Sequence, residues 1–468
     1  MSTSSHGTLE APLRLTEVDF GLLRECMPGV TLTGDNYERG KMYGQAFAEK
    51  ITANVGRHVD HPNLPPLEFC LTLILDYYIP GLQYHWHAGW EELQGMSEGC
   101  GIDVEFLVLL NVREDLVSIS HLPEGAPETT TAFFLPRATA DESAILAHSF
   151  TVAKPAYDLD LMHSIEVRPG HGLANIFMVV EAGMLSGCGM NSSGLAVAAN
   201  AIYSSLDCAP GGDEPYFPVT CLERYLLASA TLDTAGDIIG AMAIHASRHV
   251  IVANAEGRSR SLECTPRRGY SHTGPIGATS KLHGNHFQSF DAYLHRDEVT
   301  DRYRGPASQD RVRRLQQLVD DVRSRTGGRA TPQQVRAMFS DHVGGGGGGS
   351  GSGTAGMLCM HREAYRPNMT AGLAMFDTRR RVVSVCKGPP CRGTMMHFRF
   401  QAIVGGDNDE ESNSTSSSSD SSSSDGSSSA AASASARASH ERVEDWFATA
   451  TASWSRKNSP ASEGGSAV

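Results

Sequence analysis

The sequence lacks several features that would place a protein in a class at once. No apolar run comes near the roughly 18 uninterrupted residues of a membrane span, and the first residues, MSTSSHGTLEAPLRL, contain no apolar stretch of the signal-peptide kind. The ten cysteines form no CxxC pair and no regular framework. These absences argue against a membrane protein and against a disulfide-built secreted protein. They predict a soluble cytoplasmic chain with free thiols.

The sequence also has fewer basic than acidic residues. The chain has 39 Lys and Arg residues against 53 Asp and Glu residues, which gives a formal net charge of −14. Binding to a nucleic acid needs a concentrated basic face, and the densest basic run, Arg379 to Arg381 in DTRRRVV, has the composition of an exposed hairpin turn. We therefore expect neither a nucleic acid nor a membrane as a partner.

Composition divides the 468 residues into four segments. Residues 1–29 are expected to form a lead-in, and residues 30–404 a single folded domain with a Gly-rich loop at 344–356. Residues 405–440 consist mainly of Ser and acidic residues, too polar to offset the entropy of ordering, and are predicted to be disordered.

The final segment, residues 441–468, contains ERVEDWFATATASW, in which the apolar side chains fall loosely on one helical face. Two interpretations remain open. Residues 441–457 could form a docking helix for a protein partner, or a marginal helix that packs back on the domain.

The periodicity of the apolar residues changes along the domain. The first hundred residues have helical spacing, as in GKMYGQAFAEKIT, whereas short β-rich runs separated by turns begin at Thr129. Helical patterns return at 217–245 and 308–339, and predicted hairpins surround Asn254 and Arg380. Helices, strands, helices and strands in one domain predict an α+β fold with two stacked sheets between helical layers.

Several stretches, taken in order, resemble one family: the acyl-coenzyme A:6-aminopenicillanic acid acyltransferase-like (penicillin acyltransferase-like) proteins of the N-terminal-nucleophile hydrolases. The resemblance covers roughly residues 30 to 400 and rests on RGKMYG, EELQGMSEGCGIDVEFLVLLNVRED, VVEAGMLSGCGMNSSGLAVAAN, LHGNHF, SDHVG, LCMH and GPPCRGTMMHF.

The resemblance implies an αββα sandwich that is made as a precursor. Such proteins cleave themselves before a cysteine, then use its side chain as the nucleophile and its new α-amino group as the base. Their reactions are hydrolysis of small amides or acyl transfer to small amines, sometimes from a coenzyme A thioester. The implied partner is therefore a small-molecule amide or acyl donor. No cofactor is implied, although an acyl-coenzyme A could serve as a substrate.

The family register places Thr130 at the nucleophile, because Thr131, Ala132 and Phe133 follow it as the small and apolar residues of the strand. No cysteine lies between Cys100 and Cys188, so the thiol is replaced by a hydroxyl.

Other family positions carry further site residues. Thr151 stands at the family's acid and His249 at its oxyanion asparagine, and Asn200 is a further donor; with Thr130 these residues form the expected catalytic set. Ser149, His148 and Asn285 are the expected substrate-binding residues.

A threonine can perform this chemistry. Once freed at an amino terminus, its α-amino group has an ordinary pKa of roughly 7.7 to 8.0, which suits a general base near neutral pH. The alternative is that the three threonines only begin a strand, since Thr favours β structure. The chain would then be a catalytically inactive relative that binds a ligand or a protein, and the sequence leaves both alternatives open.

The remaining motifs predict structure rather than chemistry. GMSEG around Ser97 fits a serine-hydrolase elbow, but a helical pattern precedes it where a strand is required. The HWH and HGNH groups lack a carboxylate or thiolate at a zinc-type offset, so no metal site is expected. Near the Gly-rich loop we expect a cluster held by structural hydrogen bonds, made of Asp341, His342, Cys359 and His361.

Overall fold

The computed structural model describes residues 13–16, 27–59, 61–120, 128–170, 172–229, 231–266, 269–273, 278–289, 299–303, 307–325, 327–343, 357–361 and 368–402. All of them belong to a compact unit, Met1–Val404. The predicted Gly-rich loop 344–356, the low-complexity segment 405–440 and the tail 441–468 lie outside the described residues.

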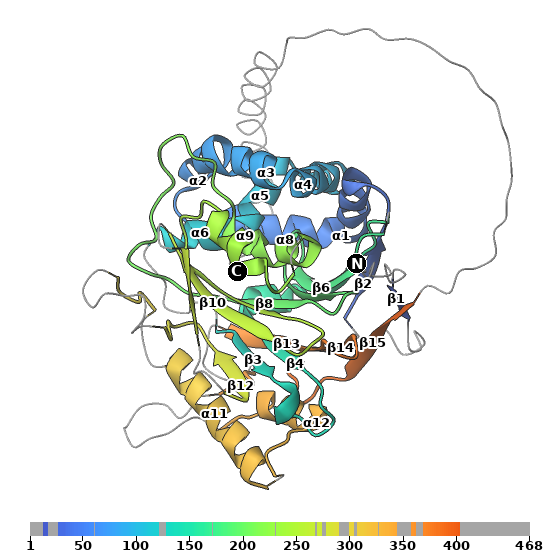
Figure 1. Ribbon diagram of the computed structural model, residues 1–468. Coiled ribbons are helices and arrows are strands. Elements are labelled where there is room, and N and C mark those ends of the chain that lie inside the picture. Colours follow the sequence, from blue (N-terminus) through green and yellow to red (C-terminus); the bar gives the residue numbers. More distant parts are fainter. Residues whose placement is uncertain are drawn as a thin grey trace, which may run out of the picture. The chain divides into compact units, whose positions relative to one another are not determined.

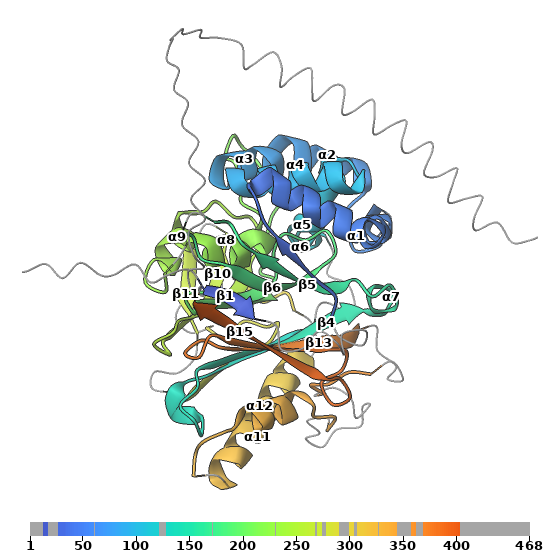
Figure 2. The same ribbon diagram turned by 90° about the vertical axis from the view of Figure 1, so that its right-hand side faces the viewer.

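Two mostly antiparallel sheets form the centre of the domain (Figures 1 and 2). The seven-stranded sheet has the spatial order β1 (Leu13–Thr16), β15 (Met395–Ala402), β14 (Val382–Lys387), β13 (Asn368–Asp377), β4 (Ile145–Ala153), β3 (Thr130–Phe134), β12 (Ser280–His283). The eight-stranded sheet has the order β11 (Gly269–His272), β10 (Ser259–Thr265), β9 (Arg248–Ala253), β8 (Ala196–Ala201), β7 (Cys188–Asn191), β6 (Ile176–Glu181), β5 (Met162–Val167), β2 (Gly29–Leu32). Only β2 and β5 pair in parallel among these strands.

Helices cover the outer face of each sheet, which gives the four layers of an αββα sandwich (Figure 1). Over the eight-stranded sheet lie α1 (Asn36–Val59), α2 (Leu67–Leu73), α3 (Ile79–His85), α4 (His87–Cys100), α5 (Val104–Asn111), α6 (Arg113–Ser118), α8 (Leu222–Ser229) and α9 (Ala235–Ala241). Over the seven-stranded sheet lie α11 (Ala307–Arg325) and α12 (Pro332–Phe339), and the short α7 (Lys154–Asp158) follows β4. The predicted α+β sandwich is confirmed.

The GMSEG motif has a packing role. It lies inside α4, and the Ser97 hydroxyl donates to the carbonyl of Ile102 at 2.6 Å. A Cβ atom at Gly95 would lie 1.9 Å from the carbonyl oxygen of Tyr37, so only glycine permits this approach of α4 to α1. The motif is therefore a helix contact, and the element directly before α4 is helix α3, where an elbow would need a strand.

Local sequence signals explain several element ends. Thr331 caps α12 in a reciprocal capping box with Gln334, as the Thr-Pro start predicts. The β9–β10 hairpin turns at Asn254, and Gly257 in this turn has a φ angle of 77°. The β13–β14 hairpin turns at Arg380. Both predicted hairpins are present: glycine supplies the positive φ in the first turn, whereas in the second Arg381 adopts φ 56°.

Two apolar clusters separate the layers. The inter-sheet cluster contains Phe133 and Phe150 of the seven-stranded sheet together with Met190 and Ile251 of the eight-stranded sheet. The outer cluster packs the other face of the seven-stranded sheet against α11 and α12. Strand β3 is buried on both faces as a result.

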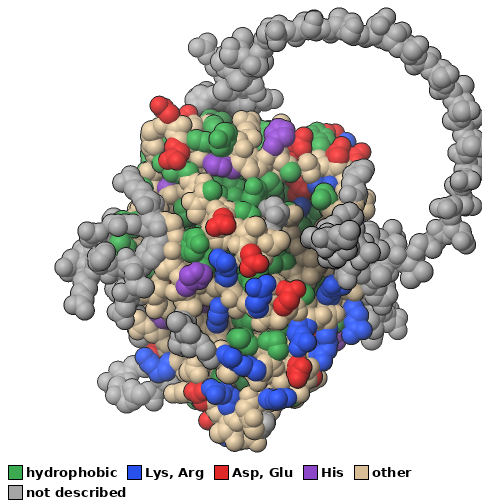
Figure 3. Space-filling view, in the orientation of Figure 1, with side chains coloured by type: hydrophobic (Ala, Val, Ile, Leu, Met, Phe, Trp, Pro, Cys, Tyr) green, Lys and Arg blue, Asp and Glu red, His purple; other side chains and the backbone are tan. Residues whose placement is uncertain are grey.

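The charge on the surface and the character of the helices concern the two partners that the sequence argues against, a nucleic acid and a membrane. On the face shown in Figure 3, Lys and Arg side chains gather over the lower half, with Asp and Glu side chains among them. The absence of a nucleic-acid partner stays a prediction. Across the described ranges, no helix has the length and apolar character needed to cross a membrane.

Candidate active site

The three consecutive threonines have different surroundings because side chains alternate between the two faces of a strand. Phe133 belongs to the inter-sheet cluster, whereas Ala132 and Phe134 belong to the outer cluster beside α11 and α12. This alternation directs Thr131 toward the eight-stranded sheet and Thr130 toward the outer helices. Thr129, just before the strand, lies on the inter-sheet side and is the partly exposed member of the three.

Two side-chain amides converge on the hydroxyl of Thr129. Asn200 of β8 donates from Nδ2 to Thr129 Oγ1 at 2.9 Å. Asn285, which follows β12, donates from its own Nδ2 to the same oxygen at 3.2 Å. A strand of one sheet and the segment that follows a strand of the other therefore present hydrogen-bond donors at this single oxygen atom.

The amide of Asn200 is held in one orientation. Its Oδ1 accepts from the Thr131 hydroxyl at 2.8 Å and lies 3.0 Å from Nδ1 of His249 on β9. Since the carbonyl end of the amide already has these partners, the NH₂ end must point toward Thr129. His148 of β4 completes the arrangement, with Nδ1 2.8 Å from the Thr131 hydroxyl.

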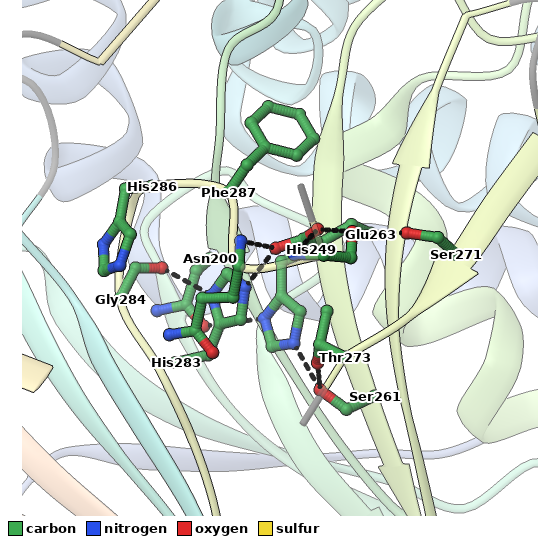
Figure 4. A network of polar contacts seen from close by, with 12 residues as sticks. Asn200, His249, Ser261, Glu263, Ser271, Thr273, His283, Gly284, His286 and Phe287 are labelled. Carbon is green, nitrogen blue, oxygen red and sulfur yellow. Dashed lines mark hydrogen bonds and ion pairs between the residues drawn. The ribbon is translucent and has the colours of Figure 1, made fainter. Parts of the chain in front are cut away.

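A further set of contacts supports His249 (Figure 4). Its Nε2 lies 2.8 Å from the Ser261 hydroxyl, and its ring stacks on His283 at a centroid distance of 3.4 Å. His283 is held in turn between the Gly284 carbonyl and a Glu263 carboxylate oxygen, each 2.8 Å from a ring nitrogen. His249 therefore orients Asn200 and does not itself reach Thr129.

Arg311 links Asn285 to the residue before Thr129. Its side chain is fully buried (0% exposed), and it donates to Asn285 Oδ1 at 3.1 Å and to Glu128 Oε1 at 3.2 Å. Asn285 Nδ2 also donates to the Ala201 carbonyl at 3.0 Å. A helix of the outer layer thus fixes both an amide donor and the start of the Glu128–Thr129 peptide.

The carbonyl of that peptide has its own donor. The Thr151 hydroxyl donates to the main-chain oxygen of Glu128 at 3.2 Å. On the adjacent peptide, the Thr130 N–H donates to Ser149 Oγ at 3.0 Å, and the Ser149 hydroxyl donates back to the Thr130 carbonyl at 3.3 Å. These contacts hold the chain on either side of Thr129 against β4.

A cavity of about 250 Å³ opens beside Thr129. Apolar side chains line part of it, namely Phe150, Met162, Val179 and Met184, and Thr129, His148 and Thr151 also lie on its wall. Its volume is below the usual range of roughly 300 to 1,000 Å³ for drug-sized ligands, so it suits a small group.

The charged side chains on the cavity wall neutralise one another. Glu181 accepts from Arg57 at 2.8 Å and from Arg113 at 2.7 Å, and Arg248 pairs with Glu114 and Glu223. Burial acts to raise the pKa of Glu181, but the two guanidinium groups outweigh it and lower that pKa to about 2.

Burial keeps His148 and His249 neutral. It lowers the pKa of His148 to about 3, with a further contribution from the Arg248 charge. It also lowers the pKa of His249 well below its ordinary value, and the neighbouring His283 adds to the effect. Neutral rings suit this network, because each neutral ring offers one donor and one acceptor nitrogen.

The structure brings most of the predicted site residues together, but they surround Thr129 and not the predicted Thr130. Asn200 and Asn285 contact Thr129, Thr151 contacts Glu128, and His148 and His249 support the network through Thr131 and Asn200. Thr130 and Ser149 instead contact each other, and the Thr130 side chain is directed to the outer face. The amide donors of this network therefore converge on the residue before Thr130, and the role of Thr130 stays a prediction.

Sequence reasoning missed Thr129, Glu128 and Arg311. A strand with one solvated face would have revealed the register by alternation, but Ala132, Phe133 and Phe134 are all apolar, because both faces of β3 are buried. Nothing in the sequence marks Arg311 as buried, since its partners Glu128 and Asn285 are 183 and 26 residues away.

Comparison with known families gives a match over less than half of the chain. Residues 140–347 match the family described as acyl-coenzyme A:6-aminopenicillanic acid acyl-transferase. The chain is similar to that family over these residues. No protein in the curated set matches the chain significantly.

Two solved structures illustrate the similarity. A mutant of conjugated bile acid hydrolase from Clostridium perfringens is 10% identical, with a TM-score of 0.36, over 60% of this chain and 100% of the other. Penicillin V acylase from Agrobacterium tumefaciens is 13% identical, with a TM-score of 0.28, over 55% of this chain and 82% of the other.

Proposed function

We propose that this protein is an N-terminal-nucleophile amidohydrolase or acyltransferase that cleaves its own Glu128–Thr129 bond and then uses Thr129 as its nucleophile. The observation that carries the proposal is the set of three donors around the Glu128–Thr129 bond and the Thr129 hydroxyl. Asn200 and Asn285 donate to Thr129 Oγ1, while Thr151 donates to the carbonyl oxygen of Glu128.

Self-cleavage would proceed through an acyl shift. Thr129 Oγ attacks the carbonyl carbon of Glu128, and the Thr151 hydroxyl stabilises the oxygen on which negative charge develops. The C–N bond breaks as the hydroxyl proton passes to the departing nitrogen, which leaves an ester. Water hydrolyses that ester to a Glu128 carboxylate and a free Thr129 α-amine.

The mature site would repeat this chemistry on a substrate. The α-amine of Thr129 takes the hydroxyl proton as Oγ attacks an amide carbonyl, and it returns the proton to the leaving amine. The Asn200 and Asn285 amides then lie where they can donate to the reacting oxygens. Water releases the acyl group in a hydrolase, and an acceptor amine takes it in an acyltransferase.

The cavity suggests a substrate class. Its apolar wall, formed by Phe150, Met162, Val179 and Met184, suits a small acyl chain, and its paired charges offer no excess of either sign. The proposed substrate is therefore a small N-acyl amide. A coenzyme A thioester is a second acyl donor to test beside it.

Mass analysis of the purified full chain tests the proposal. We expect fragments of residues 1–128 and 129–468, with Thr at the new amino terminus. Thr129→Ala should stay intact and Thr129→Ser should cleave, while Thr130→Ala is the matched control and should cleave like the natural chain.

Three outcomes would contradict the proposal. Cleavage in Thr129→Ala, or its loss in a folded Thr130→Ala, would move the nucleophile to another residue. A natural chain that remains intact and hydrolyses no N-acyl substrate would favour the second candidate function, a catalytically inactive relative that binds a ligand or protein partner.

A further inference from the structure

A second cluster of reactive side chains lies on the other side of the seven-stranded sheet. It consists of His342, Cys359, His361 and Cys391, which we name the His/Cys cluster. Each residue offers one ligand atom, and the four atoms all lie within 4.8 Å of one another. Leu358, the neighbour of Cys359, belongs to the outer apolar cluster beside α11 and α12, so the His/Cys cluster is separate from the Thr129 site.

The distances among His361 and the two sulfurs have the pattern of a tetrahedral metal site. The sulfurs of Cys359 and Cys391 are 3.7 Å apart, and His361 Nε2 lies 3.6 and 3.3 Å from them. Bonds of about 2.3 Å to sulfur and 2.0 to 2.1 Å to nitrogen place tetrahedral ligands about 3.8 Å (S–S), 3.5 Å (S–N) and 3.3 Å (N–N) apart. The His342 to His361 nitrogen distance of 2.9 Å is about 0.4 Å short of that geometry.

A disulfide and simple hydrogen bonding both fit the His/Cys cluster less well than a metal ion does. A disulfide needs its sulfurs about 2.05 Å apart, far closer than the 3.7 Å found here. Hydrogen bonding, which the sequence led us to expect, joins groups in pairs, and a thiol is only a weak donor. It does not require four donor atoms to gather around one point.

Three segments supply the ligands, and each is anchored. His342 follows Asp341, whose carboxylate receives two hydrogen bonds from Arg314 of α11, at 2.8 and 3.0 Å. The Cys359 N–H donates to the Asp341 carbonyl at 3.1 Å, which ties the second segment to the first.

The third segment, the turn between β14 and β15 that carries Cys391, is anchored by α12. Arg336 donates to the Pro390 carbonyl at 2.9 Å and to the Gly393 carbonyl at 2.6 Å. Ligands held in place by outer contacts are typical of a preformed metal site.

We propose that His342, Cys359, His361 and Cys391 bind one zinc ion as a structural site. Two thiolates and two imidazoles are a common tetrahedral zinc set, and four protein ligands leave no open position for catalysis. The ion would join the end of α12, the segment 357–361 and the β14–β15 turn on the outer face of the sheet (Figure 1).

Metal analysis of the full chain, made without an affinity tag and dialysed against zinc-free buffer, tests this proposal. We expect about one zinc ion per chain, falling to less than about a tenth in Cys359→Ser and in Cys391→Ser. Cys386→Ala is the matched control, since Cys386 lies near the same turn but outside the cluster, and it should retain the metal.

Cobalt substitution gives a readout that does not depend on the variants folding. The chain refilled with Co²⁺ should show the intense visible bands of tetrahedral cobalt with thiolate ligands. The proposal would be overturned if the natural chain is isolated without zinc and shows no such bands after Co²⁺ is added. Zinc retained in Cys359→Ser would also overturn it. So would a Cys359–Cys391 disulfide in non-reducing peptide maps of the freshly isolated protein.

Discussion

The two faces of the seven-stranded sheet carry polar groups that are arranged in opposite ways. On the inner face, the Thr129 hydroxyl receives two amide donors, and each amide is oriented by further hydrogen bonds. On the outer face, the His/Cys cluster gathers four lone-pair donors around one point. The first arrangement suits an oxygen on which charge develops, and the second suits a cation.

This difference shows that the kind of partner can be inferred from the direction of the hydrogen bonds. Amide N–H groups directed at one oxygen stabilise negative charge, as in an oxyanion hole. Sulfur and imidazole nitrogen atoms directed at one point stabilise positive charge instead. Variants that affect one face and spare the other can separate the two roles.

The largest expected effect is a loss of stability in Arg311→Met, a variant that alters the network on the inner face. This change removes the cation that pairs with the buried Glu128 and releases Asn285, and loss of one member of a buried pair costs about 3 to 5 kcal/mol. Urea denaturation measures the free energy of unfolding. The zinc content of the folded fraction should not change.

The control for this change lies on the same helix. Arg313 pairs with Asp310, but its side chain is 57% exposed, so Arg313→Met should cost no more than about 1 kcal/mol. Adding Glu128→Gln to Arg311→Met should recover part of the loss of stability, because it removes the carboxylate that has lost its ion pair with Arg311. Equal costs for Arg311→Met and Arg313→Met would contradict the inferred role of the buried pair.

The second-largest expected effect is on the rate of substrate hydrolysis. Asn200→Ala removes one amide from Thr129 Oγ1 and should slow substrate hydrolysis about 100- to 1,000-fold, which corresponds to about 2.7 to 4 kcal/mol. Hydrolysis of an N-acyl substrate is followed on chain that has already matured. Cys359→Ser, which alters only the outer face, should retain the natural rate constant at a temperature where it is folded.

The smallest expected effect is a dependence on pH. The pKa of His148 is about 3 in the folded chain and about 6.5 when unfolded, so below about pH 6.5 the unfolded state binds the extra proton. Stability therefore falls as the pH drops from about 6.5 toward 3. Between about pH 7.5 and pH 5, the free energy of unfolding should fall by about 2 kcal/mol less in His148→Gln than in the natural chain.

Denaturation curves at the two pH values give this difference. His87→Gln is the matched control, since the His87 side chain is 67% exposed and outside the network, and it should leave the loss of stability as in the natural chain. An unchanged loss in His148→Gln would mean that His148 is not held neutral by the fold.

The layers were predictable from the sequence because they depend on local signals. Helical spacing at GKMYGQAFAEKIT, the Thr331 cap and the Asn254 turn each fix an element without reference to distant residues. His148, Asn200 and Asn285 came from the family resemblance, and the structure places them in one network.

The details that escaped prediction depend on burial and on distant partners. Strand β3 is apolar on both faces, so alternation could not distinguish Thr129 from Thr130. An arginine on a helix ordinarily faces water, and Arg311 is buried only because Glu128 and Asn285 reach it from remote segments. Cys391 joins its cluster for the same reason, 30 residues after His361.

The chain's path has a consequence for handling the protein. Residues before Thr129 supply β1 to one sheet, β2 to the other and the helices α1 to α6, so a cut at Glu128 would sever the backbone without releasing either piece. The matured protein should migrate as two bands under denaturing conditions, yet elute from a sizing column as a single species. Co-expression of the separate halves is then a practical way to place a chosen residue, natural or not, at the new amino end.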